Sequence, residues 1–263
     1  MIPEASASSR LKIESILSEK NKFTFYWDRI KDLDIPIPKT EIIFLEEKDG
    51  QLWWDTSEII STLNTWGAEE AFVRSNYKSA PHRLRSGSHI SKREPSEINR
   101  TIESLLSQLS ASNWEHGGAL VLRQWLDLNF CMRAEHRGCH PEVRFFIEDG
   151  EILSFTPREI GSEDICDMQY DHLERIINSG TNEIPLRYAH RVAKEFTEYT
   201  WAVDFVMDTN GNWFCTEMGL NAIYWNTESA DWLNHCDHND LEALSPREIH
   251  SCALYYGRLP ETH

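Results

Sequence analysis

Long apolar runs are missing from this 263-residue chain. No segment approaches the roughly 18–20 apolar residues that a membrane helix needs, and the polar first 20 residues lack the core of a signal peptide, so we expect neither. Basic residues are also scarce: 26 Lys and Arg against 43 Asp and Glu give a formal charge of −17. This balance argues against a surface built for nucleic acid or anionic membrane, but leaves room for a nucleotide in a local basic cleft.

Paired cysteines are missing too. The six cysteines are scattered without a CxxC pair, and a chain of this length needs no disulfides, so we expect reduced thiols in a cytoplasm. Cys139-His140 and the HCDH segment at 235–238 contain zinc-ligand residue types, but neither has the spacing of a structural zinc site. Ser-His-Asp and Cys-His nucleophile signatures, internal repeats and low-complexity segments are absent as well.

What is present predicts a folded α+β protein. Hydrophobic residues make up 40% of the chain, with 10 Trp. Strands alternate with helices and end in long hairpins, which favours mostly antiparallel sheets. Helices are predicted at 9–20, 26–33, 57–66, 96–110, 162–178 and 186–199, and strands at 41–45, 71–77 and 119–128.

The most informative stretch runs from Trp201 to Asn221. Its Asn210-Gly211 pair predicts a two-residue type I′ hairpin turn. That register puts Asp204 directly opposite Glu217, with Cβ atoms about 4.5–5.5 Å apart. The other face of the hairpin is nearly all apolar and is expected to pack on a core: Trp201, Val203, Phe205, Met207, Phe214, Thr216, Met218 and Leu220.

Two facing carboxylates repel unless a proton or a cation lies between them. Oxygen ligands, with the amide oxygen of Asn221 on the same face as Asp204 and Glu217, suit Mg²⁺, which water and phosphate oxygens usually complete. The alternative is a pair of solvated acids on the wet face of a hairpin. The apolar opposite face favours the metal.

Cations, Ser and Gly gather in one loop, which follows a strand that carries a single Arg. Arg74 lies in the strand at 71–77, and the loop at 83–92 gathers cations, Ser and Gly. Backbone N–H groups of such a loop can cradle phosphate, although a flexible basic surface loop is the alternative.

A second hairpin spans 141–158, with a type I′ turn predicted at Asp149-Gly150. Its predicted register groups five residues on one face: Glu142, Arg144, Phe146, Leu153 and Phe155. Arg144 in such surroundings needs either an internal carboxylate, such as Glu142, or a ligand phosphate.

With these residues assembled, the chain resembles the ATP-grasp superfamily from Ile35 to about Asn221. The ordered motifs are IPIPKT (35–40), FVRSNYKSA (72–80), LVLRQWLDLN (120–129), VRFFIEDGEIL (143–153) and VDFVMDTNGNWFCTEMGLN (203–221). Within the superfamily, LVLRQW followed by VRFFIEDGEILSFTPRE is most similar to the cell-division-cycle-123 family and to related prokaryotic and viral proteins.

The resemblance implies a helical segment (1–34), a small lobe (35–118) and a large lobe (119–263) that ends in a helical tail, with ATP and Mg²⁺ between the lobes. By position, it assigns phosphate contacts to Arg74, Lys78, Lys92 and Arg144, a catalytic role to Arg144 and Arg158, adenine contacts to Gln124, Trp125 and Leu126, and the metal to Asp204, Glu217 and Asn221. The chain departs from the superfamily in having Gly219 where an Asn is usual and Arg74 where many members have Lys.

The function implied is an ATP-dependent carboxylate–amine (or carboxylate–thiol) ligase that acts through an acylphosphate. An ATP-binding assembly factor for a protein partner, as in the cell-division-cycle-123 family, is the second hypothesis. A metal-free structural or interaction domain is the third. The second substrate or partner would be set by loops such as 133–140 and by the tail after Asn221, where no motif is readable.

Overall fold

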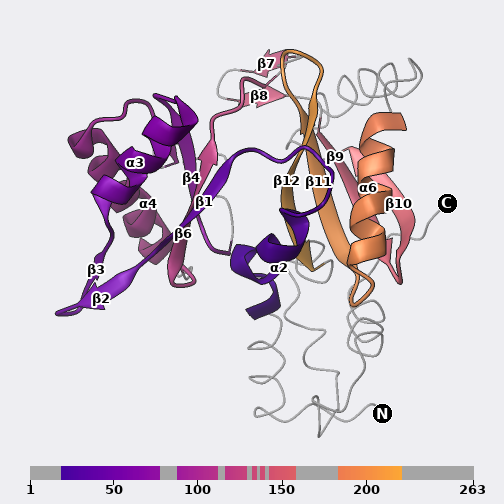
Figure 1. Ribbon diagram of the computed structural model, residues 1–263, viewed down its shortest axis with the longest axis horizontal. Helices are drawn as coiled ribbons and strands as arrows, with labels where there is room; N and C mark the ends of the chain where they lie inside the picture. Colours follow the sequence, from indigo (N-terminus) through magenta and orange to yellow (C-terminus); the bar gives the residue numbers. More distant parts are fainter. Residues whose placement is uncertain are drawn as a thin grey trace, which may run out of the picture.

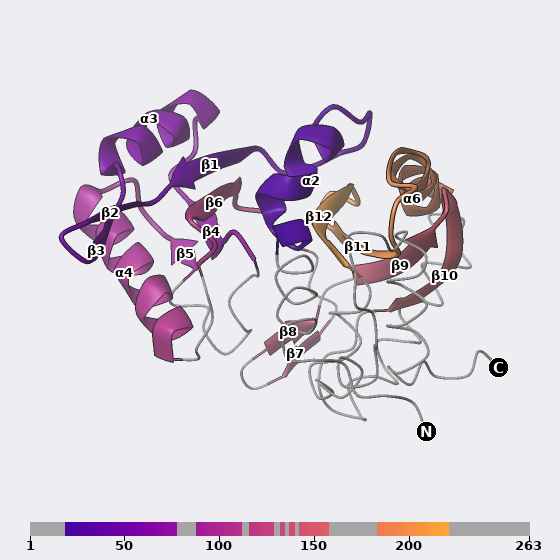
Figure 2. The same ribbon diagram turned by 90° about the horizontal axis from the view of Figure 1, so that it is seen from below.

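The computed structural model describes residues 19–77, 88–111, 116–128, 132–134, 137–139, 142–157 and 183–220. They form two four-stranded antiparallel sheets with helices packed against them, which confirms the expected α+β class. The two sheets lie side by side, with helix α2 (Phe23–Ile30) between them (Figures 1 and 2). No helix in these ranges is long and apolar enough to cross a membrane.

The first sheet has the strand order β1-β6-β4-β5. Its strands are β1 (Thr40–Phe44), β6 (Ala119–Gln124), β4 (Ala71–Ser75) and β5 (His89–Ile90). Helices α3 (Thr56–Trp66) and α4 (Pro95–Ala111) pack on one face around an aliphatic core that includes Ile43, Leu63, Val73, Ile102 and Leu120. A small hairpin of β2 (Glu46–Lys48) and β3 (Gln51–Trp53) extends from this sheet (Figure 1).

The second sheet has the order β10-β9-β11-β12. Its strands are β9 (Glu142–Glu148), β10 (Glu151–Pro157), β11 (Trp201–Met207) and β12 (Trp213–Leu220). Helix α6 (Glu183–Glu195) and helix α2 contribute to a core rich in aromatic side chains, among them Tyr26, Phe145, Phe196, Trp201, Phe205 and Trp213. A separate ribbon pairs β7 (Met132–Ala134) with β8 (Arg137–Cys139).

The connection between the sheets is short. Strand β6 lies at the start of the segment expected to form the large lobe (119–263). It nevertheless pairs with β1 and β4 of the first sheet, whose residues belong to the expected small lobe. Only residues 125–127 separate it from Leu128, which forms an isolated bridge with Asp208 at the tip of the β11–β12 hairpin. The N–H of Thr209 also donates to the carbonyl of Asp127 (2.8 Å). The hairpin tip is therefore tied to the segment that joins the sheets.

The two hairpin turns differ in how well they were predicted. At Asp149-Gly150 both φ angles are positive (50° and 82°), which confirms the type I′ turn. At Asn210-Gly211 the prediction is wrong, because among these two only Gly211 has a positive φ (82°). Asp208 N–H donates to the Asn212 carbonyl (2.9 Å), which closes a three-residue loop over 209–211.

The side chain of Asp208 explains the longer loop. Its Oδ1 accepts the backbone N–H groups of Asn210 (2.9 Å) and Asn212 (2.8 Å), so the carboxylate satisfies donors inside the loop. Burial raises the pKa of Asp208, but these hydrogen bonds outweigh it and the net pKa is lowered. The carboxylate therefore stays charged and holds the loop at neutral pH.

Two β-bulges then shift the registers. In β12, Cys215 pairs with Phe205 and Glu217 with Asp204, so Thr216 is the extra residue. On the tip side of this bulge the core therefore receives Trp213 and Cys215, in place of the predicted Phe214 and Thr216. In β10 the register shifts between Ile152 and Ser154, so Thr156, not Phe155, lies opposite Arg144.

Most predicted helices are found within a few residues of their expected bounds. The predicted helix at 26–33 is α2, that at 57–66 is α3, that at 96–110 is α4, and that at 186–199 is α6, which begins at Glu183 and ends at Glu195. The predicted helix at 162–178, and that at 9–20 apart from its last two residues, lie outside the described residues.

Candidate functional site

The two acids that were predicted to face each other do so. Asp204 of β11 pairs with Glu217 of β12, on the face opposite the aromatic core. Asp204 is 1% exposed and Glu217 is 6% exposed. The alternative of two solvated acids on a wet hairpin face is therefore wrong, because both carboxylates are removed from water.

Arg144 is the partner of Asp204. Strand β9 lies on the other side of β11, and its register sets Arg144 opposite Asp204. Arg144 Nε donates to Oδ1 and Nη2 to Oδ2, each at 2.7 Å. This bidentate geometry is the strong form of an arginine–carboxylate pair. Asp204 is thus an internal carboxylate of the kind that the sequence required for Arg144, for which Glu142 was the predicted example.

Arg74 brings the first sheet to the site. It lies in β4, is 1% exposed, and its Nη2 is 3.0 Å from Glu217 Oε1. The same guanidinium donates to the backbone carbonyls of Ser75 (3.3 Å) and Tyr77 (3.1 Å). The four side chains, which were predicted from three motifs, therefore meet as two ion pairs at the junction of the two sheets.

Arg123 is a part of this junction that the sequence reasoning missed. From β6 it donates Nη1 to the carbonyl of Thr216 and Nη2 to the carbonyl of Cys215 (3.2 Å). Burial, with the positive charge of Arg74 next, lowers the pKa of Arg123 to about 10, so it remains a cation at neutral pH. An Arg directly after the apolar run ALVL (119–122) was the available signal.

Helix α2 and the residues just before it support β12 from the side. Asn21 Oδ1 accepts the N–H of Leu220 (2.9 Å), and the Tyr26 hydroxyl accepts that of Met218 (3.4 Å). Burial raises the pKa of Tyr26 strongly, although Arg74 opposes the shift, so the hydroxyl stays neutral. The Phe23 ring lies 5.5 Å from the guanidinium carbon of Arg123 and 5.7 Å from that of Arg74.

The predicted adenine contacts lie where β6 ends. Gln124 Oε1 accepts the N–H of Lys39 (3.4 Å), and Trp125 is 40% exposed. The Trp125 ring stacks on His89 of β5 at 3.9 Å between centroids. Leu126, next in the chain, is half-buried. An aromatic platform thus stands at the end of the first sheet.

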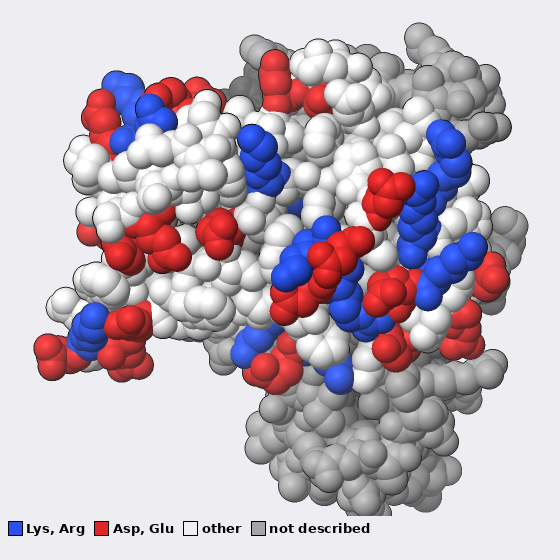
Figure 3. All heavy atoms as spheres, viewed as in Figure 1, with Lys and Arg blue, Asp and Glu red and all other residues white. Residues whose placement is uncertain are grey.

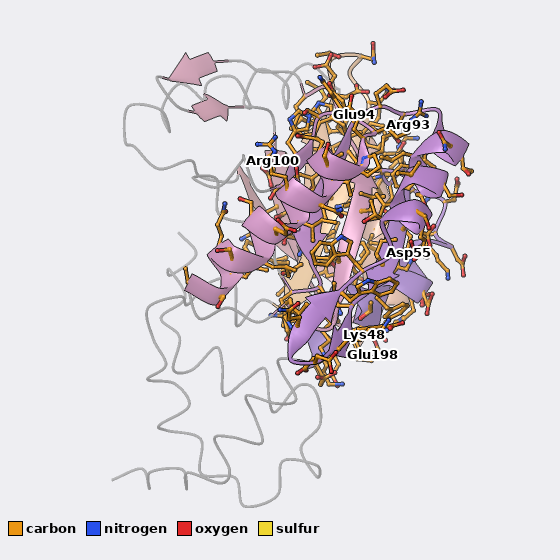
Figure 4. All side chains as sticks on the ribbon, turned by 90° about the vertical axis from the view of Figure 1, so that its left-hand side faces the viewer. Lys48, Asp55, Arg93, Glu94, Arg100 and Glu198 are labelled. Carbon is orange, nitrogen blue, oxygen red and sulfur yellow. The ribbon has the colours of Figure 1, made fainter. Side chains whose placement is uncertain are left out.

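The described residues include only one of the remaining predicted contacts. Lys92 is exposed beside β5. Lys78, Arg158 and Asn221 lie outside the described residues. Arg93 and Arg100 lie at the outside of the molecule, near the first sheet (Figure 4). Arg93 pairs with Glu69, and Arg100 pairs with Glu97. On the face seen in Figure 3, basic and acidic described residues are mixed and form no continuous basic patch.

The donor set fits Mg²⁺ only in part. No three His, Cys, Asp or Glu side chains within the described ranges gather as a metal site, so Asp204 and Glu217 would supply two ligands. Each carboxylate oxygen that accepts an arginine N–H keeps a second lone pair for a metal. Mg²⁺ is commonly held by one or two carboxylates, with phosphate and water oxygens completing its shell. The pair therefore suits Mg²⁺ that arrives with a phosphate ligand.

Comparison with known proteins gives similarity of structure. No family model matches the sequence, and no curated protein matches it significantly. The similar structures include Cdc123 from Schizosaccharomyces pombe, which is 12% identical over 90% of this chain and 92% of its own, with a TM-score of 0.47.

Two further similar structures are a purK N5-carboxyaminoimidazole ribonucleotide synthetase with ADP and the ATP-grasp ligase PsnB with its minimal precursor. The first is 9% identical over 93% of this chain, with a TM-score of 0.46, and the second is 13% identical over 78%, with a TM-score of 0.39. The match spans only 53% and 52% of those two proteins. The roles of individual residues rest on the geometry above.

Proposed function

We propose that this protein binds ATP with Mg²⁺ at the junction of its two sheets and uses it to activate a carboxylate for attack by an amine. The observation that supports this most directly is the buried quartet of Asp204, Glu217, Arg144 and Arg74. It joins three strands of the second sheet to one strand of the first.

Charge balance explains why such a quartet would bind metal and phosphate together. Two carboxylates and two guanidinium groups sum to zero, so a divalent cation alone would leave a buried excess of positive charge. A polyphosphate alone would leave an excess of negative charge. If both were bound together, Asp204 and Glu217 would hold Mg²⁺ while Arg144 and Arg74 would donate to phosphate oxygens. Metal and nucleotide affinity should therefore be strongly coupled.

The chemistry proposed needs only positioning and neutralisation of charge. Mg²⁺ would offset the charge of the triphosphate, and Arg144 and Arg74 would orient its oxygens. The terminal phosphoryl group would move to the substrate carboxylate, and an amine would then displace phosphate from the acylphosphate. Arg158, Lys78, Lys92 and Asn221 remain proposed contacts, as do Gln124, Trp125 and Leu126 for the adenine. A cytoplasmic setting belongs to the same proposal.

The test is calorimetric titration of the full chain with ATP, with and without Mg²⁺. Wild type should bind Mg·ATP tightly and metal-free ATP weakly. Asp204→Asn and Glu217→Gln should each cut affinity for Mg·ATP at least as much as loss of a group that only orients a metal ligand does, which is about 10- to 100-fold. Glu97→Gln is the matched control, because Glu97 pairs with Arg100 at the surface. If the two site variants bind Mg·ATP as well as wild type does, the proposed metal site is wrong.

Turnover separates the ligase from the second hypothesis. A ligase should release ADP and phosphate only when a suitable carboxylate and amine are supplied together. Tight Mg·ATP binding with no ADP formed across a screen of such pairs is the result expected of an ATP-binding assembly factor for a protein partner. Mass spectrometry of ligands retained on purification would show which nucleotide the protein carries.

A further inference from the structure

The bulge at Thr216 decides which way Glu217 points. On the tip side of the bulge, the pairs are Met207 with Trp213 and Phe205 with Cys215. If that register continued, Asp204 would pair with Thr216, and Glu217 would turn to the other face of β12, among the aromatic side chains of the core. The one extra residue returns Glu217 to the face of Asp204. The acid pair therefore depends on the bulge being kept.

A bulge leaves backbone groups without their ladder partners, and buried groups of this kind need others. Arg123 supplies two donors, one to the Thr216 carbonyl and one to that of Cys215 (3.2 Å). The Thr216 hydroxyl adds a contact to the Asp204 carbonyl (3.4 Å). Both carbonyls that Arg123 binds belong to the bulge, at the point where the register changes.

Apart from these two hydrogen bonds, the surroundings of Arg123 are unfavourable for a cation. It is 5% exposed and lies close enough to Arg74 for that cation to lower its pKa, after burial. A buried cation beside a second one is retained only where its hydrogen bonds compensate. Because the guanidinium is a rigid fork, its two N–H groups can reach adjacent carbonyls at once, as they do here.

We propose that Arg123 is a positioning residue: from the first sheet, it holds the Thr216 bulge of the second sheet and so keeps Glu217 opposite Asp204. It would act through the backbone of β12, without touching metal or nucleotide. The inference that Arg123 affects Mg²⁺ binding rests on the proposed function. The inference that Arg123 fixes the register of β12 against β11 does not.

The test compares Arg123→Met and Arg123→Lys with wild type, using the full chain. The readout is the ratio of ATP affinities with and without Mg²⁺, because a general loss of stability would not change that ratio selectively. Arg123→Met should lower the Mg²⁺-dependent gain by about 10- to 100-fold, as loss of an outer support typically does, while affinity for metal-free ATP stays near wild type. Arg123→Lys keeps the charge but not the fork, and should fall between the two.

Arg191→Met is the control, because Arg191 likewise donates to a backbone carbonyl, that of Asp34, but lies at the surface, where it also pairs with the Asp34 carboxylate. It should leave the ratio unchanged. If Arg123→Met folds and keeps the wild-type ratio, the proposal is overturned. If Arg123→Met does not fold, Arg123→Lys decides: a wild-type ratio there overturns the proposal equally.

A second readout does not depend on ATP. Cross-strand nuclear Overhauser contacts should join residue 204 to residue 217 in wild type, and these contacts should weaken or move to residue 216 in the Arg123 variants. An unchanged 204–217 contact in a folded Arg123→Met protein would refute the positioning role. If wild type itself shows no Mg²⁺-dependent ATP binding, the proposed function fails, and the register data still decide the role of Arg123.

Discussion

Arg144 holds Asp204 with two parallel hydrogen bonds, Nε to Oδ1 and Nη2 to Oδ2, both 2.7 Å long. The Asp204 side chain is 1% exposed and that of Arg144 is 12% exposed. The carboxylate proposed to bind metal is thus also half of a buried ion pair. Removing it takes away a proposed ligand and breaks this ion pair, so binding and stability should change together.

Asp204→Asn should lower the free energy of unfolding by about 3 kcal/mol, because breaking a buried pair leaves one charge uncompensated. Adding Arg144→Met should restore much of this loss, since the stranded cation is then removed. Urea denaturation of both single variants and the double variant measures the coupling. The exposed pair of Arg191 and Asp34 is the control, where Asp34→Asn should have almost no effect. An Asp204→Asn protein as stable as wild type would contradict the pairing.

Arg144→Ala should weaken ATP more than adenosine. The guanidinium is proposed to bind phosphate oxygens once Mg²⁺ shares the Asp204 carboxylate, and adenosine has no such oxygens. We expect about a 10-fold larger loss for Mg·ATP than for adenosine, measured by calorimetry on the same preparation. Equal losses for the two ligands would assign Arg144 to the fold alone.

The sequence predicted the Asp204–Glu217 pair correctly for a reason that is partly wrong. The loop at 209–211 is one residue longer than the predicted two-residue turn, which moves the register by one. The bulge at Thr216 moves it back. The alternation of apolar and polar side chains could not reveal the longer loop or the bulge. Thr216 is compatible with either face of a strand, and Asn-Gly is compatible with a two-residue or a three-residue loop. The carboxylate of Asp208 decided between them.

Contacts across the two sheets were beyond reach of the sequence pattern. Arg74 and Glu217 belong to different sheets, and nothing local relates a strand ending at Ser75 to one beginning at Trp213. Arg123 was missed because its acceptors are backbone carbonyls, which carry no sequence signature. Patterns of local periodicity predicted the strands and helices well, whereas the partners of buried charges depend on how the sheets dock.

Stability should decline at alkaline pH partly through Cys215. Burial raises the pKa of this thiol to about 12, although Arg123 opposes the shift. The unfolded thiol ionises near its ordinary value of 9.0, so between that value and about 12 unfolding releases a proton and the free energy of unfolding falls as pH rises. Cys215→Ala should remove about 1 kcal/mol of the loss between about pH 8 and about pH 10.

The measurement is urea unfolding of wild type and Cys215→Ala at both pH values. The comparison near pH 8 isolates the cost of the cavity, because the thiol is then neutral in both states. The same burial should make Cys215 unreactive, so its peptide should remain unalkylated after native treatment with iodoacetamide. Parallel alkaline losses in the two proteins, or ready alkylation, would show that the thiol is not held neutral by burial.

Gly117 should tolerate alanine less well than its neighbour Gly118. Both have positive φ (70° and 75°), so alanine is strained at either position, but only at Gly117 would the new Cβ lie 2.9 Å from Asn76 Cβ and from the Tyr77 ring. Asn76 Oδ1 also accepts the N–H of Thr24, at the start of α2 (3.0 Å). Displacing Asn76 would therefore disturb both the start of α2 and the end of β4.

Gly118→Ala measures the backbone strain alone, because nothing lies within 4 Å of a Cβ there. Gly117→Ala should lower the free energy of unfolding by about 1–3 kcal/mol more than Gly118→Ala does, which is the usual cost of overpacking. Because the Tyr77 carbonyl accepts from Arg74 (3.1 Å), Gly117→Ala should also weaken Mg·ATP binding, while Gly118→Ala should not. Equal unfolding midpoints for the two variants would mean that Asn76 and Tyr77 yield freely, and that the end of β4 does not hold Arg74 in place.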